Sequence, residues 1–447
     1  MPDETYIRIK NTEVEDSKKL TFRISFSKDL KKYFFRNQFY VKFDKSIRDI
    51  DNSVLNIPGV SGLIALSWVV DSKLYVNELD SYYLESLGKV KNVFKKFYPN
   101  LRLKGDIQVK NRDFNYYPSN KKGLLFSGGI DSTCSLLKRK ENPPVLYSII
   151  GGVIPSNNEE FIHNFKEVYT NLANIKKTKI HFIETNLRDL LNEPLLTYKF
   201  RNEINEWSWW EALNLALVQL SLCAPLSVKE VNQLIISSSN ATKINWMPYG
   251  SDKLLDEKIG WANLRVTHDD YMIERQEKIR KILKPEILTN NLHQVLQVCN
   301  YYPIVSSDFN CGYCNKCAMT IIGLLTENID PVKCGFPIVK DFFKHLKNDK
   351  LDREVLSGIW RYWKNIQDNL DPNVCNGLYD SKKFLKWFKK TRLIKLRDNK
   401  NRTNQETRML KIQSMLPLSM QKVAFKAYLI WKYHKRKKVK VNVNPLT

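Results

Sequence analysis

Apolar and polar residues alternate along the first quarter of the chain in short runs typical of strands with one buried face. Such period-two runs occur at residues 5–10, 20–26 and 38–43. The segments 59–76 and 85–98 are predicted to be helices. We therefore expect an α+β accessory domain over residues 1–118, followed by a polar linker.

From Gly123 onward the pattern changes to a regular alternation of strands and helices. Strands are predicted at 123–126, 144–151, 179–185 and 233–239, and helices at 131–140, 158–173 and 207–224. Strands that alternate with helices of this length favour a parallel sheet wound by helices on both faces, a doubly wound α/β fold. Ligands of such sheets bind at the carboxyl ends of the strands. We expect this α/β domain to cover residues 119–335.

The last part of the chain, residues 336–447, is predicted to be a basic helical region, with an amphipathic segment at 383–396 among others. From residue 341 onward, 26 Lys and Arg stand against 9 Asp and Glu, which supplies +17 of the net charge of +25. This imbalance favours nucleic acid, an acidic partner protein or an anionic surface as a ligand. A solvated face with a frayed tail, including the run at 434–438, is the alternative.

The composition indicates a folded, soluble protein of the cytoplasm with no membrane partner. Hydrophobic residues make up 43% of the 447 positions, enough to bury a core. No stretch of about 18 uncharged apolar residues occurs, and the first ten residues contain no apolar signal core. The eight cysteines are clustered and sparse for a disulfide scaffold, which favours a reducing compartment and metal binding.

The segment LLFSGGIDSTCSLLKR places glycines and short polar residues between a predicted strand and a predicted helix. Gly128 and Gly129 allow main-chain N–H groups to approach an anion, and the helix N-terminus adds partial positive charge. Ser127 and Ser132 can hydrogen-bond phosphate oxygens, and Asp131 is expected to hold a Mg²⁺ that bridges phosphates. The loop lacks the G-x-x-x-x-G-K-[ST] pattern of γ-phosphate ATPases. An ordinary β-turn is the alternative.

This SGGxDS pattern after a strand resembles the signature of the PP-loop, or N-type ATP pyrophosphatase, superfamily, whose fold is adenine nucleotide α-hydrolase-like. The resemblance implies that ATP is cleaved between its α- and β-phosphates. A substrate oxygen attacks the α-phosphate, pyrophosphate leaves, and a nucleophile then displaces AMP from the adenylated intermediate. The loop would neutralise the departing pyrophosphate. The residues implied to bind ATP are Ser127, Gly128, Gly129, Asp131 and Ser132, of which the last two are also candidate catalytic residues.

Four cysteines have the spacing of a metal-binding knuckle. Cys311, Cys314 and Cys317 form two overlapping C-x-x-C units, and Cys299 lies upstream. Four thiolates are the number that a tetrahedral structural Zn²⁺ takes, and a closed site of this kind leaves no position for water. We therefore expect a structural zinc knuckle over residues 299–317.

Other interpretations of the cysteine cluster stay open from the residues alone. His293 or Cys334 could replace Cys299 as the fourth zinc ligand. An iron–sulfur or redox role would use the same residue types. The four cysteines could also be reduced thiols that lie near one another by chance.

A PP-loop domain that ends in a C…CxxCxxC cluster is similar to the QueC family, the 7-cyano-7-deazaguanine synthases. These enzymes activate the carboxylate of 7-carboxy-7-deazaguanine with ATP and deliver nitrogen to it, forming an amide and then a nitrile. The resemblance covers about residues 123–335. Ordinary QueC enzymes are about half as long as this chain and lack both the N-terminal domain and the basic tail.

The segments 247–261 and 266–282 resemble more closely the longer QueC-like proteins of bacterial antiphage operons, the QatC type and those of type IV CBASS. That branch implies a different acceptor. The deazaguanine acid is joined through an amide to the N-terminal amine of a partner protein from the same operon, and the reaction need not continue to a nitrile.

Two segments are candidates for the substrate pocket. Trp207, Trp209 and Trp210 carry indoles that could stack on a planar ring, and Glu211 could accept two N–H bonds from a guanine-type edge. A helix that buries its aromatic face is the alternative for this segment. The loop after the fourth predicted strand falls where a switch-point pocket would lie. Its candidate residues are Ser239, Asn240, Tyr249, Gly250, Ser251 and Asp252.

Three further residues are candidates for the chemical steps. Arg275 and Lys278 are three positions apart on a predicted helix face and could hold phosphate or a substrate carboxylate. His268, just upstream, could accept the proton of the attacking amine. The alternatives are a solvated helix face for the two cations and an ordinary structural role for the histidine.

The sequence thus predicts an ATP-dependent ligase that forms a C–N bond on a deazaguanine carboxylate and takes part in antiviral defence, with ATP, Mg²⁺ and structural Zn²⁺. Attachment to a partner protein's amine is the expected outcome, and a 7-cyano-7-deazaguanine synthase that uses ammonia is an alternative. A PP-loop enzyme that adenylates a tRNA base would suit the basic tail. A non-enzymatic, nucleotide-binding scaffold is the third possibility.

Overall fold

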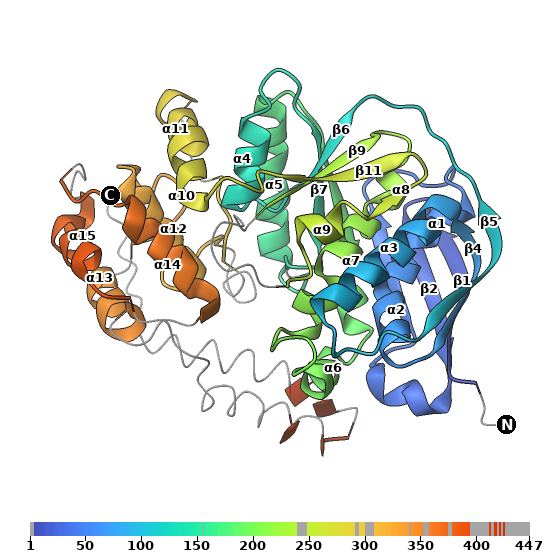
Figure 1. Cartoon of the computed structure of the whole chain (residues 1–447). Coiled ribbons are helices and arrows are strands. Elements are labelled where there is room, and N and C mark those ends of the chain that lie inside the picture. The colour runs from blue at the N-terminus through green and yellow to red at the C-terminus, as the bar shows by residue number, and fades with distance from the viewer. Residues whose placement is uncertain are drawn as a thin grey trace.

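The computed structural model describes residues 4–154, 156–238, 248–290, 295–299, 308–338, 341–351, 357–373 and 378–393, with short pieces between 411 and 424. Across this part of the chain, eleven strands form one mixed sheet flanked by helices (Figure 1). The strands lie in the order β10 (Gly260–Trp261), β11 (Leu264–Asp269), β9 (Gln233–Ser237), β6 (Lys122–Leu125), β7 (Val145–Ile150), β8 (Ile180–Thr185), β3 (Gln38–Phe43), β2 (Lys19–Phe26), β1 (Tyr6–Glu15), β4 (Lys73–Asp80) and β5 (Asp106–Asp113).

The central strands β11, β9, β6, β7 and β8 are parallel, as the alternation of strands and helices predicts. All six residues of β7 are buried, because helices cover both faces of the sheet. β11 was not predicted. Its residues LRVTHD are short and partly polar, yet they pair in parallel with β9 along five positions. The mixed α/β class of the fold is confirmed, and its assignment to the PP-loop fold stays a prediction.

The N-terminal strands continue the same sheet. The three period-two runs are strands β1, β2 and β3, and β3 pairs antiparallel with β8 at the edge of the parallel block. The helix predicted over 59–76 is wrong in its second half. Helix α2 (Ile57–Val69) ends before Asp71, whose positive φ of 56° turns the chain, and β4 follows. The helix predicted over 85–98 is confirmed as α3 (Ser81–Phe97).

Two hydrophobic cores lie on opposite faces of the sheet. On β7, Tyr147 and Ile149 contribute to one core, while Leu146 and Ile150 contribute to the other, because successive side chains point to opposite faces. The first core is covered by α1 (Asn52–Leu55), α2, α3, α6 (Glu193–Phe200), α7 (Leu215–Leu222), α8 (Ala224–Ser227) and α9 (Lys253–Asp256).

The second core lies under helices from the middle and the end of the chain (Figure 1). They are α4 (Ile130–Leu137), α5 (Glu159–Ile175), η4 (Ile279–Leu283), which continues α10 (Arg275–Lys278), α11 (Lys284–Asn290), α12 (Asn315–Thr326), α13 (Phe342–His345), α14 (Ser357–Asn369) and α15 (Ser381–Lys390). The C-terminal region is therefore packed against the α/β part of the protein through this core.

A buried histidine joins the N-terminal strands to the parallel block. His181 on β8 is 2% exposed and lies between two carboxylates, with Nδ1 3.1 Å from Asp44 and Nε2 2.9 Å from Glu230. Burial opposes the charged imidazolium, but the two carboxylates prevail and raise its pKa. Burial also raises the pKa of the Glu230 carboxyl, but the hydrogen bond from His181 and its charge outweigh burial, and this pKa falls to about 2.

The C-terminal helices confirm the amphipathic pattern within the described residues. On α15, Phe384, Leu385 and Phe388 are buried in the second core, while the lysines of the opposite face are exposed. Most of the basic helical region beyond residue 393, including the whole run at 434–438, lies outside the described residues. None of the helices described has the length and apolarity needed to cross a lipid bilayer.

Candidate functional site at the carboxyl end of the parallel strands

The Ser-Gly-Gly loop connects β6 to α4 at the carboxyl end of β6. The Oγ atoms of Ser127 and Ser132 lie 3.3 Å apart, and the Ser127 N–H donates to Ser132 Oγ at 3.3 Å. Gly129 is the N-cap residue of α4 and has no side chain to cap the helix, although its carbonyl accepts from the Thr133 N–H. The first turn of α4 therefore presents N–H groups at the loop, as anion sites at helix N-termini require.

Gly128 is held tightly by two neighbouring segments. Its φ of +74° lies in the left-handed region, and a Cβ at this position would lie 1.8 Å from the Tyr169 hydroxyl. That hydroxyl donates to the Val295 carbonyl at 3.1 Å, and the Gln297 N–H donates to the Gly128 carbonyl at 2.8 Å. The loop conformation thus depends on glycine and on contacts from α5 and from residues 295–299.

Gly128→Ala should destabilise the protein by about 2–4 kcal/mol, because it combines a strained φ with a steric clash. Gly129→Ala is the matched control, since Gly129 has a φ of −71° and its nearest neighbour would lie 3.4 Å from the new Cβ. Chemical denaturation of both variants measures the difference. Equal stability of the two variants would contradict the geometry described for Gly128.

Asp131 makes two ion pairs at the start of α4. Its Oδ2 accepts from Arg275 Nη2 at 2.6 Å, and its Oδ1 lies 3.1 Å from Lys278 Nζ. Burial raises the pKa of Asp131, but the charges of Arg275 and Lys278 outweigh burial, so the pKa is lowered and the carboxylate is charged. Lys278 is 1% exposed and also donates to the Ser238 carbonyl at the end of β9. The fold therefore brings together three residues that the sequence singled out separately.

The predicted substrate segments pack against each other. η3 (Trp210–Asn214) is a π-helical turn, and the backbone of Gly250 lies against it. The Gly250 N–H donates to the Glu211 carbonyl at 2.8 Å, and the Gly250 carbonyl accepts from the Ala216 N–H at 2.9 Å. A Cβ at Gly250 would lie 2.4 Å from the Glu211 carbonyl oxygen, so only glycine fits. Such widened turns are frequent at functional sites.

Several polar groups in these segments are engaged within the protein. The Tyr249 ring lies 5.0 Å from the Trp207 ring, and burial raises the pKa of Tyr249. Ser251 Oγ donates to Asp256 at 2.9 Å, and the Asp252 side chain caps the N-terminus of α9. These contacts order the loop before β10. Contact of these residues with a substrate stays a prediction.

Trp210 is mostly covered. It is 4% exposed, and the Arg188 guanidinium lies 4.6 Å from the centre of its ring. Glu211 accepts from Ser208 Oγ at 2.6 Å through Oε2. The aromatic residues of this segment thus belong mainly to the core, as the structural alternative had it. The candidate pocket residues Ser239 and Asn240 lie outside the described residues.

His268 lies on β11 and contacts α9. Its Nδ1 is 2.9 Å from Asp256 Oδ2, and its ring meets the Tyr271 ring edge to face. Both members of the His268–Asp256 pair are buried. Among the described residues, no hydrogen bond or ion pair connects His268 to the Ser-Gly-Gly loop. Its proposed role as a proton acceptor gains no support from these contacts.

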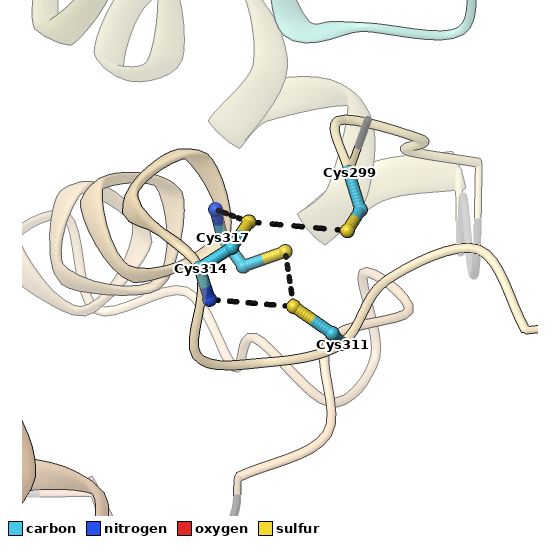
Figure 2. A group of neighbouring side chains, drawn as sticks. All are labelled: Cys299, Cys311, Cys314 and Cys317. Carbon is cyan, nitrogen blue, oxygen red and sulfur yellow. Dashed lines mark hydrogen bonds between the residues drawn. The ribbon is translucent and has the colours of Figure 1, made fainter. Parts of the chain in front are cut away.

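The four cysteines of the predicted knuckle converge on one point (Figure 2). Cys311, Cys314 and Cys317 come from the turn at the start of α12, and Cys299 approaches from the other side. All four are buried, and their sulfurs lie within 4.8 Å of one another. The Cys299–Cys314 and Cys311–Cys317 sulfur distances are both 3.8 Å. Four sulfurs at 2.3 Å from a tetrahedral Zn²⁺ would be about 3.8 Å apart.

The donor set therefore fits a metal such as zinc, with Cys299 as the fourth ligand. Cys334 is buried but does not belong to the group of four, and His293 lies outside the described residues. The Cys314 sulfur also accepts from the Cys317 N–H at 3.4 Å, so the knuckle caps α12. Because the four ligands fill a tetrahedral shell, the site suits a structural role.

The cysteine cluster is connected to the loop through a short chain of hydrogen bonds. Asn310 accepts from the Val298 N–H at 3.0 Å and donates to the Leu296 carbonyl at 2.7 Å. Gln297 lies between Leu296 and Val298 in sequence, and its N–H donates to the Gly128 carbonyl. The segment that carries Cys299 is therefore also the segment that supports the candidate phosphate loop.

The sequence analysis missed residues of α14 that reach this site. The Tyr362 ring centre lies 5.2 Å from the Arg275 guanidinium and 4.9 Å from that of Arg361. Burial and the charge of Glu211 raise the pKa of Tyr249. The charge of Arg361 acts in the opposite direction and is outweighed. The only available signal was the aromatic and basic composition of the segment, which the amphipathic pattern explains equally well.

A separate pocket of about 520 Å³ opens near the amino ends of β6 and β9, away from the loop. Lys45 and Glu230 on its wall form an ion pair at 3.5 Å, and Lys229 donates to the Asp49 carbonyl. Lys45, Glu230 and Lys229 are thus engaged within the protein. Arg275 and Lys278 meet instead at Asp131, near the carboxyl ends of the strands.

In comparisons with known proteins, no family model, no curated protein and no solved structure matches the chain.

Proposed function

We propose that the protein is an ATP pyrophosphatase of the PP-loop type, which adenylates the carboxylate of a 7-deazaguanine acid and transfers the acyl group to an amine. The observation that carries the proposal is the arrangement around Asp131. A glycine-rich loop ends a parallel strand and begins a helix, and two cations, the half-buried Arg275 and the buried Lys278, meet the acid of that loop. This combination suits an anionic, phosphate-bearing ligand.

The residues support a simple division of roles for the first step. The substrate carboxylate attacks the α-phosphorus of ATP, the bond from that phosphorus to the bridging oxygen breaks, and pyrophosphate leaves with the electron pair. N–H groups of the loop and the cations Arg275 and Lys278 would stabilise the negative charge on pyrophosphate. When phosphate oxygens bind Arg275 and Lys278, the Asp131 carboxylate would no longer pair with these cations and could bind Mg²⁺. One or two carboxylates, together with phosphates and water, are enough to hold Mg²⁺ in such sites.

In the second step an amine attacks the acyl carbon, AMP leaves, and the amine loses a proton. The resemblance to the longer QueC-like proteins favours the N-terminal amine of a partner protein as the acceptor, and ammonia is the alternative. The cysteine cluster has no part in this chemistry. With zinc bound, it would hold Cys299 and therefore the segment that supports Gly128.

Purified protein incubated with ATP, Mg²⁺ and 7-carboxy-7-deazaguanine should release pyrophosphate and AMP. The matched control is 7-cyano-7-deazaguanine, which has the same ring but no carboxylate to adenylate, and it should give no release above background. Equal release with both compounds, or formation of ADP and phosphate, would contradict the proposal. Intact-mass spectrometry of a co-expressed partner then distinguishes a protein acceptor from ammonia.

A further inference from the structure

The segment that follows β5 displays two aromatic side chains to solvent. Phe114 is 93% exposed and Tyr116 is 75% exposed, and no other aromatic side chain in the described part of the chain is exposed to this degree. Covering a large ring is favourable, because it removes apolar area from water. Two such rings on one short segment therefore indicate a surface that a partner covers.

The segment itself is firmly anchored. Exposure alternates over residues 112–117, with the even positions exposed and the odd positions half-buried, as in an extended chain. Asn115 Nδ2 donates to the buried Asp80 at 2.9 Å. The Asn263 side chain accepts from the Tyr117 N–H and donates to the Tyr117 carbonyl, both at 2.9 Å. Because these contacts fix one side of the chain, the rings on the other side lose little conformational entropy when a ligand binds.

Cations flank the two rings along the chain. Before the rings, Lys110 and Arg112 of β5 are exposed, and neither has an ion pair within the described residues. After the rings, residues 118–121 form part of the wall of the 520 Å³ pocket near the amino ends of β6 and β9. Lys229 Nζ on the same wall lies 5.7 Å from the centre of the Tyr117 ring, so the pocket adjoins the aromatic segment.

The wall of this pocket carries more positive than negative charge. The lining residues include Lys45, Lys121 and Lys229 but only one carboxylate, Glu230. Glu230 pairs with Lys45 and also with the buried His181. In the described part of the chain, Lys121 and Lys229 have no ion pair, and the hydrogen bond of Lys229 goes to a neutral main-chain carbonyl. An anionic group is the ligand that would balance this wall.

Exposed rings beside unpaired cations match the chemistry of a single-stranded nucleic acid. Unpaired bases stack on aromatic side chains, while phosphates bind Lys and Arg along the same path. A duplex keeps its base faces stacked inside and so has no use for the rings. A chain that adds to the edge of β5 would be held by main-chain hydrogen bonds and would not need the lysines of the pocket.

We propose that this surface binds a single-stranded nucleic acid, with Phe114 and Tyr116 stacking on bases and Lys121 and Lys229 binding phosphate oxygens. The surface lies away from the Ser-Gly-Gly loop, so the inference is independent of the proposed function. It places nucleic-acid binding in the N-terminal part of the protein, in addition to any contribution from the basic C-terminal region.

Fluorescence anisotropy tests the inference, with the full chain titrated into a labelled single-stranded RNA of about 12 nucleotides. Phe114→Ala should weaken binding by about 5- to 100-fold, the loss expected for one stacked base. Ile175→Ala is the matched control. Ile175 is an apolar residue at the end of α5 that is 68% exposed, and its loss should change the affinity by less than about 2-fold.

Salt titrations of the same complex test the cations. Lys121→Gln should weaken binding and reduce the slope of log affinity against log salt by about 1, because one phosphate contact is lost. Lys96→Gln removes an exposed charge from α3 and should leave the slope nearly unchanged. All four substituted side chains are exposed, so each variant should keep the unfolding temperature of the wild type.

Three results would overturn the inference. Equal binding by wild type and Phe114→Ala would assign binding to charge alone, as expected of the basic C-terminal region. A duplex of the same length that binds more tightly than the single strand would exclude stacking on unpaired bases. Wild-type protein that ignores the RNA and instead self-associates along β5, measured by sedimentation, would assign this edge to strand addition. None of these results bears on the release of pyrophosphate.

Discussion

Asp131→Asn is expected to lower pyrophosphate release from ATP by at least about 100-fold, the loss typical of one preorganised electrostatic group. The substitution keeps the shape of the side chain and removes its charge. Arg275 and Lys278 lose the carboxylate that orients them, and Mg²⁺ loses its candidate ligand. Steady-state release of pyrophosphate, with the deazaguanine acid as the substrate, measures the effect.

The same substitution should also destabilise the protein, by about 3–5 kcal/mol, because it leaves the buried Lys278 and the half-buried Arg275 without their carboxylate partner. Asp269→Asn separates the two effects. Asp269 pairs with Lys138 and Arg139 near the other end of α4, so it has the same kind of network outside the loop. This control should lose stability but retain pyrophosphate release when assayed below its unfolding temperature. Release retained by Asp131→Asn would remove Asp131 from the proposed mechanism.

Cys299→Ser should reduce the bound zinc well below one per chain and cost more than about 4 kcal/mol of stability, as losses of structural metals do. The effect extends beyond the cluster, because Gln297 contacts Gly128 in the loop and Val295 contacts Tyr169 of α5, which lies against Gly128. We therefore expect ATP binding to fall together with the zinc content. Elemental analysis, thermal unfolding and ATP calorimetry on the same preparations measure the three quantities.

Cys334→Ser is the control for that substitution. Cys334 is buried, is 1% exposed and lies outside the group of four. Its variant should keep one zinc per chain and lose only the modest stability of a buried polar substitution. Loss of zinc in Cys334→Ser, with zinc retained in Cys299→Ser, would reverse the ligand assignment. A protein rich in iron would instead favour an iron–sulfur cluster.

Local patterns predicted the elements whose signals are short-range. Four of the five strands of the parallel block, the loop before α4 and the convergence of the four cysteines agree with the predictions, because periodicity, glycine chemistry and ligand spacing are properties of neighbouring residues. The end of α2 was missed because the apolar residues of 59–76 continue through the turn at Asp71 into β4. Nothing in the composition distinguishes the two elements there.

Long-range features could not be predicted in this way. Asp131 is more than 140 positions from both Arg275 and Lys278 in sequence, and it meets them only because α10 packs against α4. The proximity of Tyr362 to Arg275 likewise depends on how α14 lies on α10. The contact of Arg188 with the ring of Trp210, which is 4% exposed, is another long-range feature that the sequence pattern could not predict.

The pairing of β3 with β8 has a practical consequence for anyone who wishes to shorten the protein. A fragment that starts at residue 119 would carry every candidate residue of the loop and the knuckle. It would also expose the row of N–H and C=O groups on β8 that β3 now satisfies, and open strand edges of this kind recruit other chains. Such a minimal fragment is a poor choice for crystallisation or assay, because it would tend to precipitate before its chemistry could be measured.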